Sequence, residues 1–292
     1  VAATNPANSR HAARMLQNVK RMPCPVQRRP QWGRGLGAAR GASRTSAGPV
    51  FSCILWGLYR QLLYDRMNQT ALVDKAFTYS HYAQRVARQF PTLADQVRGT
   101  PSARVPLAQW RAALSTATSQ TIDAELRSMR RELMLRTLVL DLACEAALEP
   151  LVADLSDFAD LALSAATNAH STDIFGSPTP PFGFSIVAMG KLGAQELNAS
   201  SDIDIVFICD EPEADAMDNL NLLARRITRT LNQEIDGEFV FRVDTRLRPY
   251  GDAGPMVPSL DFLEQYFVAQ GRMWERIAWL KSRVSCGPLA AD

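Results

Sequence analysis

Three aspartates in this sequence could together hold a divalent metal ion. Asp202 and Asp204 stand at the start of the stretch SDIDIVFICD, whose apolar residues are typical of a buried strand. Residues two apart in a strand point to the same face, so the two carboxylates project together. Each carboxylate resists ionising beside the other, and a divalent cation removes that cost. Asp244 lies in a later strand-like stretch, RVDTRLRP, and completes a three-carboxylate site if the two strands are neighbours.

The chemistry of these ligands favours magnesium or manganese. Oxygen ligands with no nearby His or Cys select Mg²⁺ or Mn²⁺. We therefore predict that Asp202, Asp204 and Asp244 are catalytic residues that bind one or two such ions. In such a site the metal activates an attacking oxygen and neutralises charge on the leaving group.

Residues near these aspartates are predicted to bind a nucleotide or phosphate. Gly190 has no side chain, so a phosphate could approach the backbone closely there. Lys191 adds a positive charge, and Ser201 could cap the turn or contact phosphate. Arg246 and Arg248 alternate with a leucine, which places both on the face of Asp244 if the strand continues through them. Arginine forks bind phosphoryl oxygens through two parallel hydrogen bonds.

Each of these signals also has a purely structural explanation. An isolated Asp-x-Asp is more often a turn at the entry to a strand, and Arg-x-Arg beside an Asp is more often a surface ion pair. The co-occurrence favours the metal–nucleotide interpretation: a strand ending in glycine, then Ser-Asp-x-Asp on a strand, then an Asp on a later strand after a helix.

Elements of two kinds must position these residues. Residues 71–167 have a helical pattern, clearest over 122–143, and Pro150 marks a break before a further helix from Leu151. The proline-rich loop 176–183 ends this region. Beyond it we predict strands over 184–190, 201–210 and 238–249, a helix over 216–235 and another from about Leu260.

This order predicts an α+β fold, with a helical N-terminal region followed by a domain whose mixed β-sheet is flanked by helices. The predicted divisions are a basic segment over 1–66, the helical region over 67–175 and the catalytic domain over 176–292. His81, His170, Trp274 and Trp279 are read as ordinary surface, core or rim residues.

Composition narrows the function classes. The chain is 47% hydrophobic and 21% charged, as in ordinary globular proteins, and no apolar run is long enough to cross a bilayer. The five cysteines are scattered, with no CxxC pair, which favours a reducing, cytoplasmic location. Residues 1–50 carry nine Lys or Arg and no Asp or Glu, so the rest of the chain has a net charge of −7. We therefore expect neither a nucleic acid nor a membrane as partner.

The basic segment itself has several interpretations. Residues 1–66 are predicted to be disordered or not native protein, with Met67 as a candidate start. The alternatives are a basic arm that binds nucleic acid or membrane, or a transit peptide, which would also be rich in Arg and poor in acids.

The longer motifs are more specific than any single residue. AMGKLGAQELNASSDIDIVF, FVFRVDTRLRPYGDAGPMVPSLDFLEQYF and GRMWERIAWLKSR resemble the bifunctional glutamine synthetase adenylyltransferase/adenylyl-removing enzymes of bacteria, within the DNA polymerase β-like nucleotidyltransferases. The resemblance is dense over 184–287, thinner back to Phe77, and absent over 1–66. The family usually reads GKLGG where this chain has Ala194 after Gly193, which strains the backbone only if that position needs a positive φ.

The resemblance implies a fragment of a longer enzyme and a specific activity. VFRVDTRLRP, GPMV and GRMWERIAW are closer to the N-terminal, adenylyl-removing half, in which phosphate attacks the AMP on a tyrosine of glutamine synthetase and releases ADP. It also implies Mg²⁺ on the three aspartates, and glutamine synthetase, ADP or ATP, phosphate and the PII signalling protein as partners. The alternatives are ATP-dependent adenylylation of glutamine synthetase and a non-catalytic regulatory module of the same fold.

Overall fold

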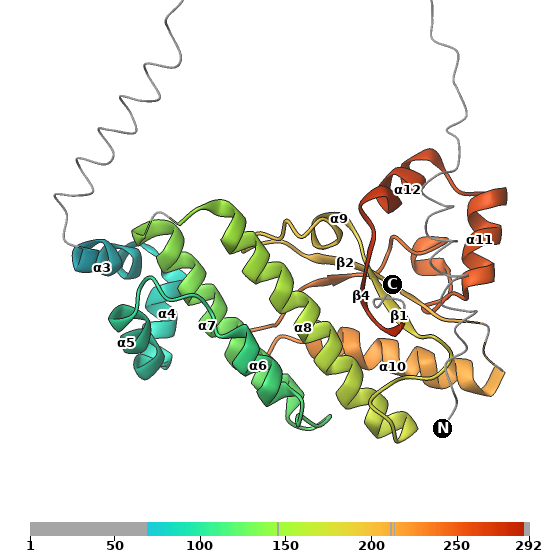
Figure 1. The fold of residues 1–292 in the computed structure, drawn as a ribbon, viewed down its shortest axis with the longest axis horizontal. Coiled ribbons are helices and arrows are strands. Elements are labelled where there is room, and N and C mark those ends of the chain that lie inside the picture. The colour runs from blue at the N-terminus through green and yellow to red at the C-terminus, as the bar shows by residue number, and fades with distance from the viewer. Residues whose placement is uncertain (1–68, 145, 211, 213, 289–292) are drawn as a thin grey trace, which may run out of the picture.

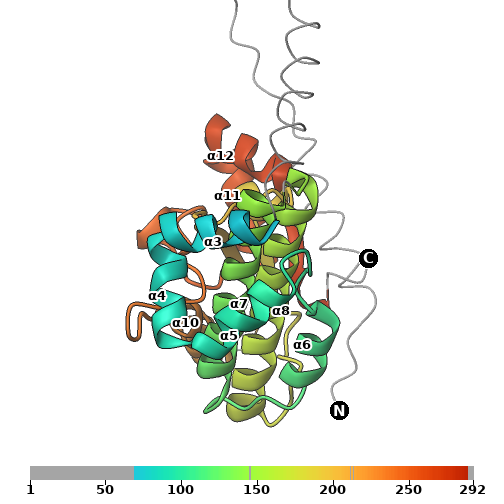
Figure 2. The same ribbon diagram turned by 90° about the vertical axis from the view of Figure 1, so that its left-hand side faces the viewer.

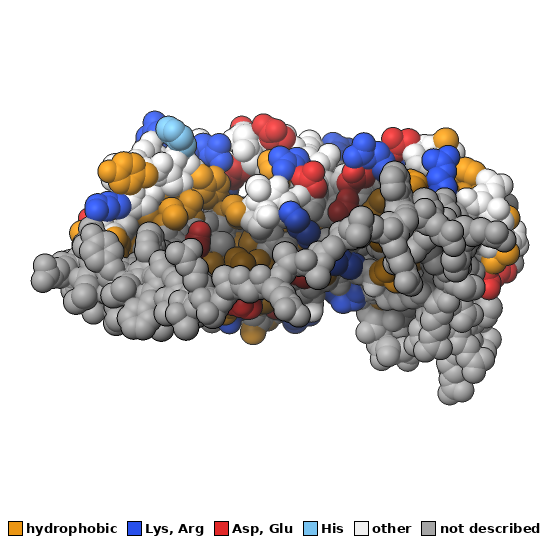
Figure 3. All heavy atoms as spheres, turned by 90° about the horizontal axis from the view of Figure 1, so that it is seen from above, with side chains coloured by type: hydrophobic (Ala, Val, Ile, Leu, Met, Phe, Trp, Pro, Cys, Tyr) orange, Lys and Arg blue, Asp and Glu red, His pale blue; other side chains and the backbone are white. Residues whose placement is uncertain are grey.

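The computed structural model describes residues 69–288 apart from 145, 211 and 213. The predictions for residues 1–66 therefore lie outside the described residues. Within the described part, no helix combines the length and the apolar character needed to cross a membrane. On the face shown in Figure 3, the described Lys and Arg side chains are interleaved with Asp and Glu side chains.

The N-terminal half is helical, as the pattern predicts. Three short helices, α3 (Gln69–Tyr79), α4 (His81–Gln89) and α5 (Pro91–Gly99), pack on the second half of α7 through a small core of its own. They are followed by α6 (Leu107–Leu114), α7 (Ile122–Ala143) and α8 (Leu148–Phe175). Figures 1 and 2 show α7 and α8 as long helices that lie next to each other.

Two of the predicted boundaries can be compared closely with the structure. The predicted bounds of α7, 122–143, are confirmed at both ends. Helix α8 begins at Leu148 rather than Leu151, and Pro150 falls in its first turn, where a proline has no hydrogen bond to lose. The helix ends at Phe175, and the next residue, Gly176, has a φ of +69°, the left-handed conformation common just after a helix C-terminus.

A four-stranded mixed sheet follows, which confirms the predicted α+β class. Its strands are β1 (Ser185–Ala188), β2 (Ile203–Ile208), β3 (Val243–Asp244) and β4 (Arg283–Cys286), in the order β3-β2-β1-β4. β1 is antiparallel to both β2 and β4, whereas β3 is parallel to β2. The parallel pair is reached by a crossover through α10 (Ala214–Asn232).

The predicted third strand, 238–249, was too long. Only Val243 and Asp244 pair with β2, because the chain turns directly afterwards. Arg248 N donates to Thr245 O at 3.4 Å and Gly251 N donates to Arg248 O at 2.9 Å, which are bonds of consecutive turns. Strand β4 was not predicted, because it has only four residues and two of them are polar.

The two faces of the sheet carry different cores. Ile186, Ala188, Ile205 and Phe207 belong to a core shared with α8 and α10. Alternate residues of the same strands, such as Val187 and Val206, pack with α11 (Leu260–Ala269) and the buried Trp279. Asp204 shares the face of Val206, because residues two apart point the same way. The Asp204 carboxylate therefore lies on the side of the sheet that packs with α11.

Two arginines of α7 hold the segment that leads into β3. Arg130 Nε donates to Val240 O at 2.9 Å, and its guanidinium lies over the ring of Phe241 at 4.7 Å. Arg131 forms a fork with the carboxylate of Glu238, at 2.9 Å from Nε to Oε1. Helix α7 thus fixes the entry to β3, although the division between helical region and catalytic domain at residue 175 stays a prediction.

Candidate active site

Asp204 and Asp244 lie side by side on the two parallel strands. They are paired residues in the register of β2 and β3. Gly190, two residues after the end of β1, lies close to Asp204, since a Cβ at Gly190 would be 2.7 Å from Asp204 Oδ2. The prediction that strands two and three are neighbours, and that Asp244 joins the Asp-x-Asp pair, is confirmed for these two carboxylates.

Asp202 lies just before β2 and is bound by an arginine that the sequence reasoning missed. Arg242 Nε donates to Asp202 Oδ1, and Arg242 Nη2 donates to Ser200 O at 2.9 Å. The alternation Arg242, Asp244, Arg246 was the available signal, because it places an arginine on each side of an aspartate along one edge. About half of each side chain in the Arg242–Asp202 pair is exposed, so other partners can reach it.

Asp244 is held by Arg246 from within the same turn. The Arg246 backbone N donates to Asp244 Oδ1 at 2.8 Å, and Arg246 Nε lies 3.0 Å from Oδ2. The side chain of Arg246 is 69% exposed and that of Asp244 is 23% exposed. The guanidinium therefore stands at the solvent side of the site, where it can reach an incoming anion.

The charges of the site shift two carboxyl groups in opposite directions. Burial raises the pKa of Asp204, and the negative charges of Asp244 and Asp202 raise it further. The hydrogen bonds from Arg246 lower the pKa of Asp244 despite its partial burial. Of these two carboxylates, Asp204 is therefore the one whose negative charge is less well balanced by its surroundings.

These residues fit a divalent cation in the chemistry of their donors. Two neighbouring carboxylates and a third nearby offer only oxygen ligands, the kind that Mg²⁺ prefers. A cation beside Asp204 would relieve the repulsion that raises its pKa. Among the described residues no group of three or more His, Cys, Asp or Glu side chains is already arranged around one point, since Asp202 turns to Arg242 and Asp244 to Arg246. Metal binding stays a prediction.

Lys191 and Ser201 lie together at the entrance from β1 to β2. Lys191 Nζ lies 3.4 Å from Ser201 Oγ, and Ser201 Oγ donates to Asn198 Oδ1 at 2.9 Å. The prediction that Gly190 ends the first strand was wrong. Strand β1 ends at Ala188, and Gly190 is the first residue of the short helix α9 (Gly190–Gly193). Its φ of +54° is a conformation that glycine adopts readily.

Arg248 does not share the face of Asp244, so the predicted alternation along the strand was wrong. The strand ends at Asp244, and Arg248 is buried with Nη1 donating to Thr245 O at 2.8 Å and to Thr245 Oγ1 at 2.7 Å. Its charge still contributes to the lowered pKa of Asp244. Arg248 therefore supports the turn after β3, and its contact with phosphate stays a prediction.

The remaining residues follow the sequence interpretation. Ala194 has a φ of −86°, so alanine is unstrained where the family usually has glycine. Gly193 is the residue that allows close packing, because a Cβ there would lie 2.0 Å from Lys281 O. Trp279 is buried in the core, and Trp274 is half exposed at the rim. His170 is a core residue that bonds Thr230 Oγ1 at 2.9 Å.

The mixed sheet with its helices, and carboxylates on adjacent strands, fit an α+β nucleotidyltransferase-like domain. The family model for glutamate-ammonia ligase adenylyltransferase matches residues 70–291, and the chain belongs to this family.

Curated relatives carry the same description. The chain is 36% identical over 242 residues to the bifunctional glutamine synthetase adenylyltransferase/adenylyl-removing enzyme of Ralstonia nicotianae, covering 75% of this chain and 25% of the relative. The protein of that name from Nitrosococcus oceani is 39% identical over 256 residues, covering 82% and 24%. That from Bordetella pertussis is 37% identical over 242 residues, covering 74% and 26%. The chain thus spans about a quarter of the length of these relatives.

Replacing Arg246 with alanine should raise the pKa of Asp244. The lowered pKa means that the pair stabilises the folded protein above the unfolded carboxyl pKa, and that this contribution is lost as the pH falls through the lower folded pKa. Without the fork, burial is the largest remaining influence and raises the pKa, while the backbone N–H of residue 246 and the charge of Arg248 still oppose it. A ¹³C NMR titration of the Asp244 carboxyl measures this shift.

The matched control is Arg225→Ala, on an exposed position of α10 away from the site. It should leave the Asp244 titration where it is in the parent chain. An Asp244 pKa that is the same in Arg246→Ala and in the parent would contradict the assigned ion pair.

Proposed function

We propose that this chain removes AMP from adenylylated glutamine synthetase by Mg²⁺-dependent phosphorolysis. An oxygen of inorganic phosphate forms a bond to the phosphorus of AMP, the bond from that phosphorus to the tyrosine oxygen breaks, and the tyrosine oxygen takes up a proton. The products are ADP and unmodified tyrosine. The observation that carries the proposal is the pairing of Asp204 with Asp244, with Gly190 against them and Arg246 at the solvent side.

Each residue has a role that its position supports. Asp202, Asp204 and Asp244 would hold Mg²⁺, which neutralises charge on the reacting phosphates. Arg246 is exposed enough to bind the attacking phosphate or the phosphate of AMP. Gly190 leaves room for the Asp204 carboxylate and for a phosphate beside it, while Lys191 and Ser201 add a cation and a hydroxyl at the same edge.

The choice of the adenylyl-removing half rests on the motifs VFRVDTRLRP and GRMWERIAW, which are closer to that half of the family. The second candidate is ATP-dependent adenylylation of glutamine synthetase, because the relatives are named for both activities and both reactions would use the same carboxylates. The third is a non-catalytic regulatory module. We further propose the PII protein as a regulator, on the family resemblance alone.

The direct test incubates the chain with adenylylated glutamine synthetase, Mg²⁺ and inorganic phosphate, and measures ADP. Phosphate-dependent ADP should form, and Asp204→Asn should reduce its rate by about 100-fold or more, since a neutral amide is a poor ligand for Mg²⁺. AMP transfer from ATP to the unmodified enzyme, without ADP release, would favour the second candidate. Neither activity in the parent chain would favour the third.

Gly190→Ala should lose activity for a reason separate from folding. The new methyl group would lie 2.7 Å from Asp204 Oδ2, so that carboxylate must leave its present position. The control is Gly237→Ala, which has a φ of +76° but open space around its Cβ. Both variants should lose about 1–2 kcal/mol of stability through left-handed strain, measured by urea unfolding.

Only Gly190→Ala should also lose turnover, by about tenfold or more, since a small displacement of a catalytic group can reduce the rate by that much. Equal activity of the two alanine variants would show that the position of Asp204 does not matter to the reaction.

A further inference from the structure

A second pocket, separate from the carboxylates, lies between α4, α7 and the segment that leads into β3. It encloses about 170 Å³. Pockets for drug-sized ligands are roughly 300–1,000 Å³, so this one suits a smaller molecule. Its walls include four arginines, Arg85, Arg127, Arg130 and Arg131, and one acidic residue, Glu238.

The arginines outnumber the acid that could balance them. Arg131 uses its fork on Glu238, with Nη2 and Oε2 2.6 Å apart. Within the described ranges, no ion pair is formed by Arg85, Arg127 or Arg130. The pocket therefore has a positive charge with no counterpart among the residues around it.

Arg130 provides the stronger observation, because it is buried and incompletely bonded. The residue is 8% exposed. Nε donates to Val240 O and Nη2 donates to Ala199 O at 3.3 Å, but Nη1 has no hydrogen-bond partner in the part of the chain that the structure describes. Arg127 Nη1 is buried and lacks a partner there as well. Buried donors are nearly always bonded, so two orphaned guanidinium nitrogens on adjacent turns of one helix call for an acceptor.

Burial also disfavours the charged form of Arg130 and lowers its pKa to about 10. An anion beside the guanidinium would oppose that effect. The bonds to Val240 and Ala199 hold the guanidinium in place, so an acceptor meets a donor that is already oriented.

The other walls are largely apolar. Tyr82, Met134 and Phe239 line the pocket together with the arginines. We propose that the pocket binds a small organic anion, whose phosphate or carboxylate group is held by Arg127 and Arg130 and whose compact apolar body packs against Tyr82 and Phe239. Both head groups carry anionic oxygens that accept charge-assisted hydrogen bonds from guanidinium nitrogens such as the two Nη1 atoms.

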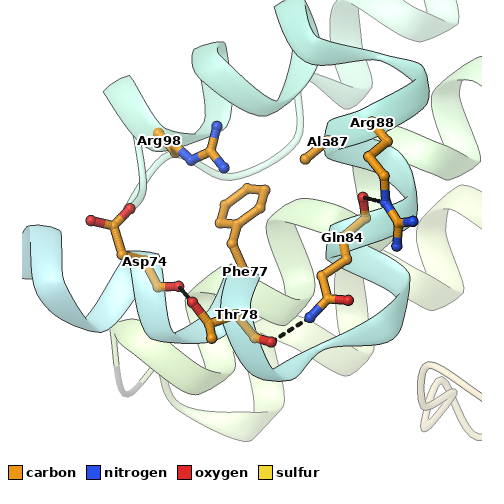
Figure 4. A pocket seen from close by; sticks show the side chains of 7 residues that line it. All are labelled: Asp74, Phe77, Thr78, Gln84, Ala87, Arg88 and Arg98. Atoms are coloured by element: carbon orange, nitrogen blue, oxygen red, sulfur yellow. Dashed lines mark hydrogen bonds between the residues drawn. The ribbon is translucent and has the colours of Figure 1, made fainter.

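A larger hollow on α3, α4 and α5 does not have these properties. It is lined by Asp74, Phe77, Thr78, Gln84, Ala87, Arg88 and Arg98 (Figure 4). Its polar groups bond to its own walls: Thr78 donates to Asp74 O, Gln84 to Thr78 O and Arg88 to Gln84 O. The charge of Arg98 lies over the ring of Phe77 at 4.1 Å and pairs with Asp95.

The proposed anion pocket is connected to the candidate active site through one loop. Arg130 bonds Ala199 O, and the next carbonyl, that of Ser200, accepts from Arg242, which binds Asp202. An anion that fixes Arg130 would therefore also steady the loop that carries Ser201 and Asp202. The proposal that an anion binds here does not depend on which reaction takes place at the carboxylates.

Isothermal titration of the 292-residue chain with phenyl phosphate and with benzoate tests the proposal. Each probe joins one head group to one aromatic ring, so the stronger binder identifies the preferred anion. At least one probe should bind at a single site, and Arg127→Gln should weaken its affinity by about tenfold or more. Arg127→Lys keeps the charge but loses the fork, so its affinity for the probe should lie between that of the parent chain and that of Arg127→Gln.

Two variants locate the binding. Arg225→Gln, on the exposed face of α10, and Arg246→Gln, at the carboxylates, should bind the probe as the parent does. If neither probe shows saturable binding to the parent chain, the proposal is overturned. Binding that survives Arg127→Gln but is lost in Arg246→Gln would also overturn it, because the anion would then occupy the candidate active site.

Discussion

The parallel pairing of β3 with β2 is the constraint on which the candidate site depends. Only two residues of β3 take part, and one backbone bond, from Ile203 N to Arg242 O at 2.9 Å, holds its start. This short pairing places Asp244 beside Asp204, although 39 residues lie between them in the sequence. A slip of one residue would turn Asp244 to the opposite face.

So short a strand needs support from outside the sheet. Helix α7 supplies it through Arg130 on Val240 and Arg131 on Glu238, and α10 supplies it through bonds from Val240 N and Phe241 N to Leu231 O. The buried ring of Phe241 contacts Phe158 of α8, with the centroids 5.8 Å apart. The helical region therefore does more than precede the sheet, because it fixes the strand that completes the carboxylate pair.

The arginines on either side of Asp244 determine how the negative charges of the site are balanced. Arg242 and Arg246 flank Asp244 along the chain and bind Asp202 and Asp244, while Asp204 is left as the carboxyl group with a raised pKa. A cation bound at Asp204 would compete with these two arginines for the neighbouring oxygens. The side chains of both arginines are more than half exposed, so they would be able to turn towards the phosphates of the proposed substrate if a metal displaced them.

Much of this arrangement could be predicted from local patterns. The bounds of α7 follow from its apolar period, and Asp202 and Asp204 stand out because charges are unusual at the start of a buried strand. The end of β3 could not be predicted, since RVDTRLRP alternates as a strand does, and only the turn over residues 245–248 breaks it. The bond from Arg242 to Asp202 and the arginine pocket depend on contacts between distant segments, which no local pattern specifies.

The most direct test of this account is whether the three aspartates bind a divalent cation. Mn²⁺ can replace Mg²⁺ at oxygen ligands, and its free aqueous signal in electron paramagnetic resonance falls when the ion binds. We predict that the chain reduces this signal, that Asp204→Asn and Asp244→Asn abolish the reduction, and that Asp218→Asn, an exposed position of α10, leaves it unchanged. Equal Mn²⁺ binding by the parent chain and by both site variants would contradict the account.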